Sequence, residues 1–174
     1  MLWLKTAGIV LIISGFGAWG LSGARRIGKR VEQLRELKMA IGFLEKEITC
    51  MYTPLSLALE RTSKFCKHPV NFLFAESSAR LKNREGITAG EAWTTGLQKL
   101  HSNSALKETD IELLSAAAHQ LGMSDVLEQE KFFRLIQEEL KIYEDQALSE
   151  MESGQKLWSY GGFILGTLIV LLLI

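Results

Sequence analysis

The chain has 174 residues, with 20 basic and 20 acidic side chains that leave no formal net charge at pH 7. This balance excludes a chain drawn as a whole to nucleic acid or to an acidic or basic partner. Charged residues make up 23% of the chain, yet none lies within residues 7–24 or 157–174. Each run approaches the roughly 20 apolar residues that cross a bilayer core. The sequence therefore predicts a membrane protein with two spans, residues 1–24 and 157–174, around one domain, residues 25–156.

Four basic residues follow the first span: Arg25, Arg26, Lys29 and Arg30. The positive-inside rule keeps such a flank in the cytoplasm. We therefore expect an uncleaved first span, a cytoplasmic domain and both termini on the outer side of the membrane. The alternative is a signal peptide cleaved after the small residues 22–24. The mature chain would then begin at Arg25 and serve as a secreted or externally facing helical adhesin or chaperone.

Small residues recur four positions apart in both spans, as Gly162 with Gly166 and as Ser14 with Ala18. This spacing allows two membrane helices to approach closely, which predicts helix pairing within the membrane. Glycine is also common in transmembrane helices in general. The spacing alone therefore leaves open an interpretation without pairing.

Between the spans, apolar residues follow helical periodicity from Ile27 onward. The first stripe is a heptad pattern made of Ile27, Leu34, Leu37, Ile41, Leu44, Ile48 and Met51. Thr53 and Pro54 are the residue types of a helix N-cap and a first helical position, so a second helix is expected after them. Pro69 predicts the start of a third helix.

The second half of the domain continues with three more predicted helices. Thr88 and Glu91 form a capping-box sequence before the fourth helix. Thr109 or Asp110 is expected to cap the fifth, which ends at Gly122. Ser124 is expected to cap the sixth, whose apolar residues Val126, Phe133, Leu140 and Ala147 repeat every seven positions. The predicted fold is all-α, a six-helix bundle whose first and last helices form a long antiparallel pair.

Few side chains in the sequence are suited to catalysis or metal binding. No nucleotide-binding, dinucleotide-binding or serine-hydrolase motif occurs. Cys50 and Cys66 fit neither a disulfide framework nor a zinc pattern, and the three histidines are scattered. We predict a protein that is not an enzyme and has no cofactor or metal. The weakest alternative is a small membrane-bound hydrolase that uses Cys66 and a histidine.

Charge is distributed unevenly along the chain. Residues 1–106 hold 15 basic and 8 acidic side chains, whereas residues 107–155 hold 4 basic and 12 acidic ones. One hypothesis is an acidic surface on the late helices that steers a basic protein partner. The alternative is that these carboxylates solvate outer faces and pair with the basic first helix. Neither interpretation involves nucleic acid.

Several short motifs resemble one family when they are taken together in chain order. They are Leu44-Glu45-x-Glu47-Ile48, Tyr52-Thr53-Pro54-Leu55-x-x-Ala58-Leu59-x-Arg61, Gly86-Ile87-Thr88-Ala89-Gly90-Glu91-Ala92-Trp93, Leu121-Gly122-x-Ser124-Asp125-x-x-x-Gln129 and Tyr160-Gly161-Gly162. In this order, between two terminal spans, they resemble the stage III sporulation protein AB family of endospore-forming bacteria. Cys50 and Met51 depart from the small or polar residues expected there.

The resemblance implies a function that the spacing of residues alone does not predict. It implies a component of the channel complex between mother cell and forespore, in the mother-cell membrane around the forespore. The domain would be similar to the cytoplasmic repeats of the inner-membrane platform protein of type II secretion and type IV pilus systems. The implied partners are a cytoplasmic hexameric ATPase similar to stage III sporulation protein AA, other channel components and possible further copies of this chain.

Two sources supply the candidate contacts for that partner. The resemblance carries over Glu45, Glu47, Glu91, Asp125 and Gln129, and the acidic late helices add Glu128 and Glu130. Two of these have an equally simple structural interpretation. Glu91 completes the capping box, and Asp125 would stabilise the first turn of a helix.

Overall fold

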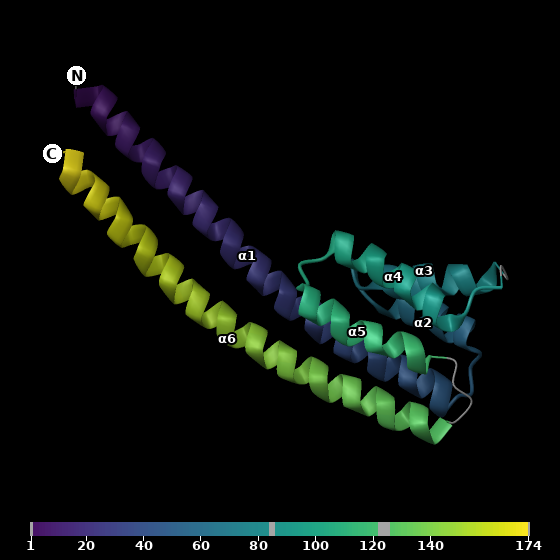
Figure 1. The fold of residues 1–174 in the computed structure, drawn as a ribbon. Helices are drawn as coiled ribbons and strands as arrows, with labels where there is room; N and C mark the ends of the chain where they lie inside the picture. Colours follow the sequence, from purple (N-terminus) through teal and green to yellow (C-terminus); the bar gives the residue numbers. More distant parts are fainter. Residues whose placement is uncertain (1, 84–85, 122–125, 174) are drawn as a thin grey trace. The chain divides into compact units, whose positions relative to one another are not determined.

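The computed structural model describes the backbone of residues 2–83, 86–121 and 126–173, and the side chains of residues 26–83, 86–118, 121 and 128–154. In these residues it has six helices and no strand, which confirms the predicted all-α fold (Figure 1). The helices are α1 (Leu2–Thr49), α2 (Leu55–Phe65), α3 (Asn71–Lys82), α4 (Ala89–Asn103), α5 (Glu108–Gln120) and α6 (Val126–Leu173). The chain divides into two compact units, residues 1–29 with 146–174 and residues 30–145. The domain limits predicted from the sequence stay predictions.

The first unit combines the N-terminal part of α1 with the C-terminal part of α6. A Cβ atom added at Gly28 would lie 3.8 Å from the sulfur of Met151, and one added at Gly154 would lie 3.4 Å from Cδ1 of Ile27. The two helices therefore pack closely and antiparallel at this level. Within the part of the chain that the structure describes, no helix is long and apolar enough to cross a membrane. The predicted spans, with Ser14, Ala18, Gly162 and Gly166, lie outside the described side chains.

The core of the second unit is built on α1. Four residues of the predicted heptad stripe, Leu34, Leu37, Ile41 and Leu44, have no exposed surface. The prediction is wrong at the end of the stripe, where Met51 is 65% exposed. The reason is that α1 ends at Thr49, so Met51 leaves the helical face that its spacing suggested.

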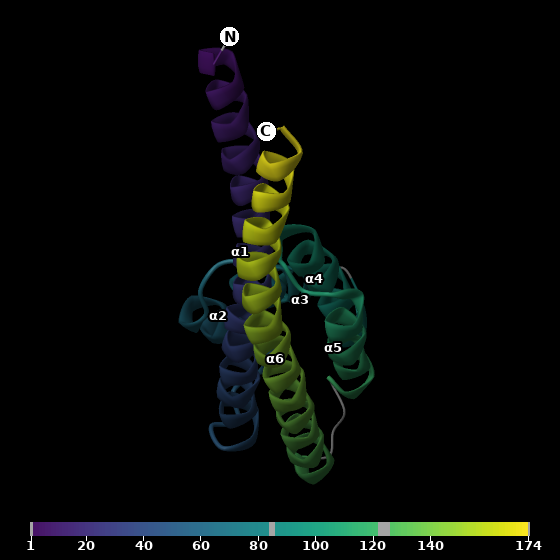
Figure 2. The same ribbon diagram turned by 90° about the vertical axis from the view of Figure 1, so that its left-hand side faces the viewer.

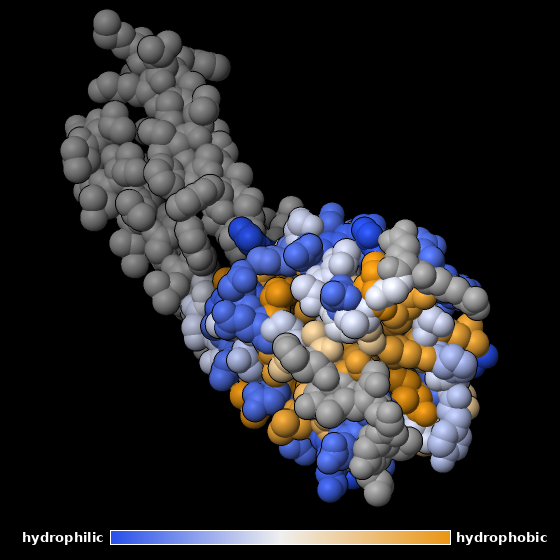
Figure 3. Space-filling model, turned by 45° about the vertical axis from the view of Figure 1, so that its right-hand side comes forward, coloured by the Kyte–Doolittle hydropathy of each residue, from blue (hydrophilic) through white to orange (hydrophobic). Residues whose placement is uncertain are grey.

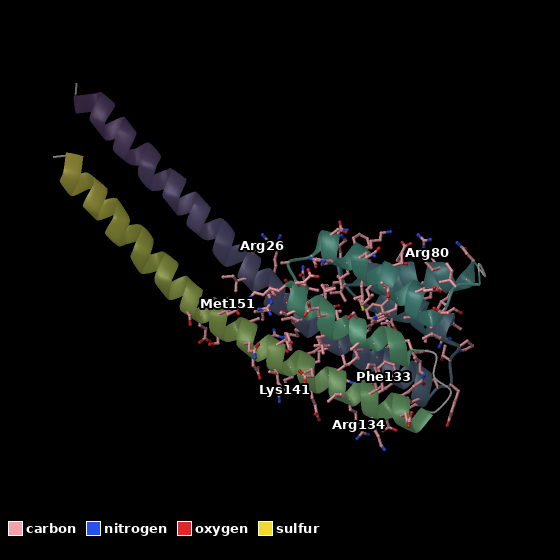
Figure 4. The ribbon with its side chains drawn as sticks, in the orientation of Figure 1. Arg26, Arg80, Phe133, Arg134, Lys141 and Met151 are labelled. Atoms are coloured by element: carbon pink, nitrogen blue, oxygen red, sulfur yellow. The ribbon has the colours of Figure 1, made fainter. Side chains whose placement is uncertain are left out.

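In this second unit, α1 and α6 run antiparallel, as predicted. Nε of Arg35 and Nζ of Lys38 donate to the Glu144 carboxylate at 2.7 and 2.5 Å. Nearer the other end, the Gln137 amide donates to Glu45 at 2.6 Å. Figure 4 shows the Phe133 side chain, which is buried, and the outward-pointing side chains of Arg134 and Lys141.

The remaining helices pack in chain order, α2 on α3, α3 on α4 and α4 on α5. Figure 2 shows α2 and α5 on opposite sides of the pair formed by α1 and α6. The Phe74 ring of α3 meets the Trp93 ring of α4 edge to face, with centroids 5.7 Å apart. Gly96 lets these two helices come close, because a Cβ atom there would overlap the Leu73 carbonyl oxygen and lie 2.5 Å from the Ser77 hydroxyl.

Several predicted helix starts need correction. Thr53 does not cap α2, because its hydroxyl donates to the Glu47 carboxylate at 2.8 Å, and the helix begins at Leu55. The third helix begins at Asn71, two residues after Pro69. The fifth begins at Glu108, which places Asp110 inside its first turn rather than at its cap. Gly122 and Ser124 lie outside the described residues.

The fourth helix starts as predicted. The Thr88 hydroxyl accepts a hydrogen bond from the Glu91 N–H at 3.3 Å, and the Glu91 carboxylate accepts one from the Thr88 N–H at 2.8 Å. This reciprocal capping box satisfies two backbone donors that the helix itself leaves without partners.

Candidate functional site

Glu47, one of the candidate contacts, is buried in the second unit. Its carboxylate is buried and accepts hydrogen bonds from the Thr53 hydroxyl at 2.8 Å and from Nη1 of Arg61 at 2.9 Å. The Thr53 N–H also donates to the Glu47 carbonyl at 2.9 Å. These bonds hold the turn between α1 and α2, so this carried-over residue has a structural role.

Two other carried-over carboxylates also have contacts within the chain. Glu45 is half-buried and receives the Gln137 hydrogen bond that ties α6 to α1. Glu91 is exposed, but both halves of its capping box are formed. The two hydrogen bonds from Thr88 hold the pKa of Glu91 below its usual value. For Glu91, the capping interpretation is the one that the geometry supports.

The first turns of α6 present carboxylates at the surface. Glu128 is exposed, whereas its neighbour Gln129 is buried. Glu130 forms an ion pair with Arg134 at 2.6 Å and keeps 36% of its side chain exposed. Asp125 lies outside the described residues. Of the seven candidate contacts, Glu128 and Glu130 are the two on α6 with accessible carboxylates among the described side chains.

The four basic residues proposed to set topology lie in different environments. Arg26 and Lys29 are exposed, and Arg26 is labelled in Figure 4. The side chain of Arg25 lies outside the described residues. Arg30 is only 4% exposed and forms a two-bond ion pair with Asp110 of α5. The topological role of this group stays a prediction, and Arg30 has a second, structural role that the sequence did not indicate.

Two more polar residues of α1 hold loops through backbone N–H groups. The Gln33 side chain accepts a hydrogen bond from the Ala105 N–H at 2.8 Å, in the loop before α5. The Glu36 carboxylate accepts one from the Lys67 N–H at 2.8 Å, in the loop after α2. Together with Arg30, these residues follow one another every three positions along α1. The sequence could have identified these three residues by their spacing, because polar residues three positions apart beside a buried stripe share a helix face.

The carboxylates of the late helices are partly paired within the chain and partly exposed, and the steering of a basic partner stays a prediction. Glu144 is buried and pairs with Arg35 and Lys38 of the basic first helix. Burial raises the pKa of Glu144, but the hydrogen bonds from Lys38 and Arg35 prevail and hold it below the usual value. Other carboxylates are exposed, namely Glu108, Glu112, Glu128, Glu138, Asp145, Glu150 and Glu152. The excess acid therefore forms internal pairs and also leaves a negative outer surface.

The thiol of Cys66 is in an environment that opposes nucleophilic chemistry. Burial and the nearby Glu36 carboxylate raise its pKa to about 12, so the thiol stays protonated near neutral pH. His101 contacts Glu108 at 3.5 Å rather than a cysteine. The described residues include no group of three or more histidine, cysteine or carboxylate side chains suited to a metal ion.

Comparison with known proteins identifies relatives over nearly the whole chain. The family described as stage III sporulation protein AB matches residues 5–174. Stage III sporulation protein AB of Bacillus subtilis (strain 168) is 31% identical over 170 residues, which cover 98% of this chain and 99% of the relative. A solved structure of a stage III sporulation protein AB superposes with a TM-score of 0.66 at 31% identity, and the match covers 71% of this chain and 96% of that one.

Proposed function

This chain belongs to the stage III sporulation protein AB family, and from that membership we propose a non-enzymatic platform of the channel complex between mother cell and forespore. Membership gives the chain a role in sporulation. The proposal adds that the helical unit docks a cytoplasmic hexameric ATPase similar to stage III sporulation protein AA.

The observation that carries the proposal is the surface at the start of α6. Glu128 and Glu130 are accessible there, and Asp125 precedes them in the sequence. Glu45, Glu47 and Glu91 have hydrogen-bond partners within the chain, and Glu130 pairs with the exposed Arg134. Among the candidate contacts, the start of α6 therefore offers the accessible carboxylates that are not part of a cap or a buried turn. Complementary charge of this kind speeds and orients protein association.

The unit of residues 30–145 has α1 at its centre, bonded to α2, α5, α6 and two loops through named side chains. Such a network, with one buried ion pair and several part-buried hydrogen bonds, favours a single arrangement of these helices. The protonated, buried Cys66 adds support for a protein without a hydrolase nucleophile.

We further propose that residues 1–24 and 157–174 anchor the protein in the mother-cell membrane and that the helical unit lies in the cytoplasm. The absence of charge in residues 7–24 and 157–174 supports the anchors. The basic residues after the first run support the orientation. N-terminal sequencing of the protein from sporulating cells should give the start of the chain. A mature N-terminus at Arg25 would instead support the secreted alternative.

Charge reversal at the start of α6 tests the docking proposal. We expect the full chain with Asp125→Lys, Glu128→Lys and Glu130→Lys to lose pull-down of the ATPase. The matched control carries Glu32→Lys, Glu112→Lys and Glu152→Lys, three exposed carboxylates at scattered positions. It changes the net charge equally and should retain binding.

Unchanged capture of the ATPase by the α6 triple variant would contradict the docking proposal. The comparison requires that the helical circular dichroism of this variant matches that of the wild type. Equal loss in both triple variants would also count against the docking proposal, because the effect would then depend on total charge rather than on the start of α6.

A further inference from the structure

The turn between α1 and α2 contains a tyrosine in a backbone conformation that tyrosine rarely adopts. Among the described residues, Tyr52 is the non-glycine residue with a positive φ, 50°. A bulky side chain reaches this left-handed region only at a cost in free energy, so glycine or asparagine is the usual residue there. Packing does not offset the cost, because Tyr52 is 76% exposed. A strained residue that the packing of the fold does not explain points to a function.

The backbone on both sides of Tyr52 is held by hydrogen bonds. Before it, the Met51 N–H donates to the Lys46 carbonyl at 3.1 Å. After it, the Thr53 N–H donates to the Glu47 carbonyl at 2.9 Å, and the Thr53 hydroxyl donates to the Glu47 carboxylate at 2.8 Å. The neighbours of Tyr52 therefore fix its position, and its side chain is exposed on a turn that is already formed.

Other apolar side chains around this turn are exposed as well. Met51 is 65% exposed, and Leu57, in the first turn of α2, is 36% exposed. Pro54 lies between them in the sequence and is also exposed. Figure 3, in which the right-hand side of Figure 1 comes forward, shows hydrophobic residues at the surface of this unit, set among hydrophilic ones. Exposed apolar side chains gathered in this way are typical of interaction surfaces. We call Met51, Tyr52, Pro54 and Leu57 the Tyr52 turn.

The Tyr52 turn lies at the same end of the unit as the start of α6 (Figure 1). The two long helices are antiparallel, and the hydrogen bond between Gln137 and Glu45 shows which of their residues lie side by side. From Glu45, α1 continues for four residues to its end at Thr49. The same direction along α6 leads from Gln137 toward Glu130 and Glu128, because both helices rise about 1.5 Å per residue. The turn after α1 is therefore a neighbour of the accessible carboxylates of α6.

Charge alone gives little specificity at this end of the unit, because the exposed side chains of Lys131 and Arg134 lie on α6 beside Glu128 and Glu130. A ring next to these charges adds recognition of a different kind. We propose that the Tyr52 ring occupies an apolar pocket of the protein that docks at the start of α6, next to the basic side chains of that partner that meet the carboxylates. This inference rests on the docking function proposed above, and it adds the chemistry of the partner's surface.

A turn that is already formed makes Tyr52 an effective anchor. Tyrosine is enriched among the few residues that dominate binding energy, because its ring covers a large area and has few rotatable bonds. Binding does not have to order the backbone around the ring, since the bonds of Thr53 to Glu47 hold it in the free chain. The strained φ of Tyr52 fits a residue kept for binding rather than for stability.

A substitution that removes the ring but tolerates the backbone tests the anchor. Asparagine accepts a positive φ, so Tyr52→Asn should leave the melting temperature unchanged or raise it. Capture of the ATPase by the full chain should nevertheless weaken about tenfold. Tyr52→Phe keeps the ring and should retain capture. The matched control is Ile142→Asn, at a position on α6 that is 50% exposed, and it should also retain capture.

Photo-cross-linking in the full chain tests whether the contact is direct. A phenylalanine that carries a benzophenone group replaces Tyr52, and the same residue replaces Ile142 as the control. On irradiation with the ATPase present, the group at position 52 should give a cross-linked product several times above that from position 142. A tyrosine with only a structural role would give equal yields at the two positions, which would contradict the inference.

The variant with Asp125→Lys, Glu128→Lys and Glu130→Lys separates failure of this inference from failure of the docking proposal. If that variant loses capture but Tyr52→Asn retains it, the ring is not part of the surface, and docking at α6 stands. If both retain capture, the docking proposal fails and this inference fails with it. Loss in Tyr52→Asn alone would mean that the turn binds apart from α6, which contradicts a shared surface. Equal loss in Ile142→Asn would also overturn the inference, since any exposed apolar side chain would then have the same effect.

Discussion

Arg30 of α1 and Asp110 of α5 form a buried ion pair with two hydrogen bonds, Nε to Oδ2 at 2.8 Å and Nη2 to Oδ1 at 2.7 Å. Asp110 has no exposed surface, and its Oδ2 also accepts the Lys107 N–H at 2.8 Å. One carboxylate therefore both stabilises the first turn of α5 and fixes that helix to α1. Loss of Asp110 would remove two charge-assisted hydrogen bonds from the buried Arg30, and loss of Arg30 would remove the guanidinium that faces the buried Asp110 carboxylate.

Asp110→Ala should lower the free energy of unfolding by about 3–5 kcal/mol, because the Arg30 guanidinium would stay buried without its carboxylate. Thermal unfolding of the full chain, followed by helical circular dichroism, measures the change. Glu112→Ala is the matched control, since Glu112 is exposed on the same helix, and it should change stability by less than about 0.5 kcal/mol. Similar melting temperatures for the two variants would contradict the structural role of the pair.

Gly96→Ala should lower the free energy of unfolding by about 1–3 kcal/mol, because the new methyl group would overlap the Leu73 carbonyl and the Ser77 hydroxyl of α3. Gly154→Ala serves as the comparison, since its methyl group would meet Ile27 at an ordinary 3.4 Å. That change should be neutral or stabilise α6 by up to about 1 kcal/mol. Denaturant midpoints measure both, and a stabilising Gly96→Ala would refute the close approach of α3 and α4.

The ion pairs of Glu144 predict how stability depends on pH. The folded-state pKa of Glu144 lies below the ordinary 4.5. Its stabilising effect is therefore complete above the unfolded-state pKa and is lost as the pH falls through the folded-state pKa. The difference in unfolding free energy between wild type and Glu144→Gln should be largest above pH 5 and should shrink as the pH falls below 4.5. A difference that stays constant between pH 6 and pH 3 would contradict this.

The two cysteines should differ in reactivity. The pKa of Cys66 is raised to about 12 by burial and by Glu36, whereas Cys50 is exposed. At pH 8, a maleimide should add to Cys50 and leave Cys66 unmodified until the chain is unfolded. Mass spectrometry of the native and the denatured protein distinguishes the two sites. Rapid native labelling of Cys66 would revive the hydrolase alternative.

Regular patterns in the sequence predicted the helices well. The heptad positions Leu34, Leu37, Ile41 and Leu44 are buried, and the capping box of Thr88 and Glu91 is formed. These features depend on residues within a few turns of one another, so spacing contains the necessary information. Spacing alone predicted that Met51 would be buried, but this residue is exposed. The position where α1 ends depends on the turn that follows it, and heptad spacing does not predict that turn.

The long-range polar contacts could not be predicted in the same way. Thr53 was expected to cap α2, yet its hydroxyl bonds to Glu47, and Asp110 was expected as a cap yet pairs with Arg30. The residues of the second pair are 80 positions apart. A sequence shows that an aspartate suits a helix start, but it does not show which distant arginine the folded chain brings to it. The same limit applies to Glu45 and Glu47, which the family resemblance placed among partner contacts.

Four of the polar residues of α1 are bonded to partners that follow in reverse order along the chain. From Glu47 back through Glu36 and Gln33 to Arg30, their partners come later and later in the chain, at residues 53, 67, 105 and 110. As the ribosome extends the chain, the residues that make these bonds with α1 become available in the order 53, 67, 105 and 110. The last of these bonds can form only after residue 110 has been made, so α5 cannot be fixed to α1 through Arg30 before its own first turn exists.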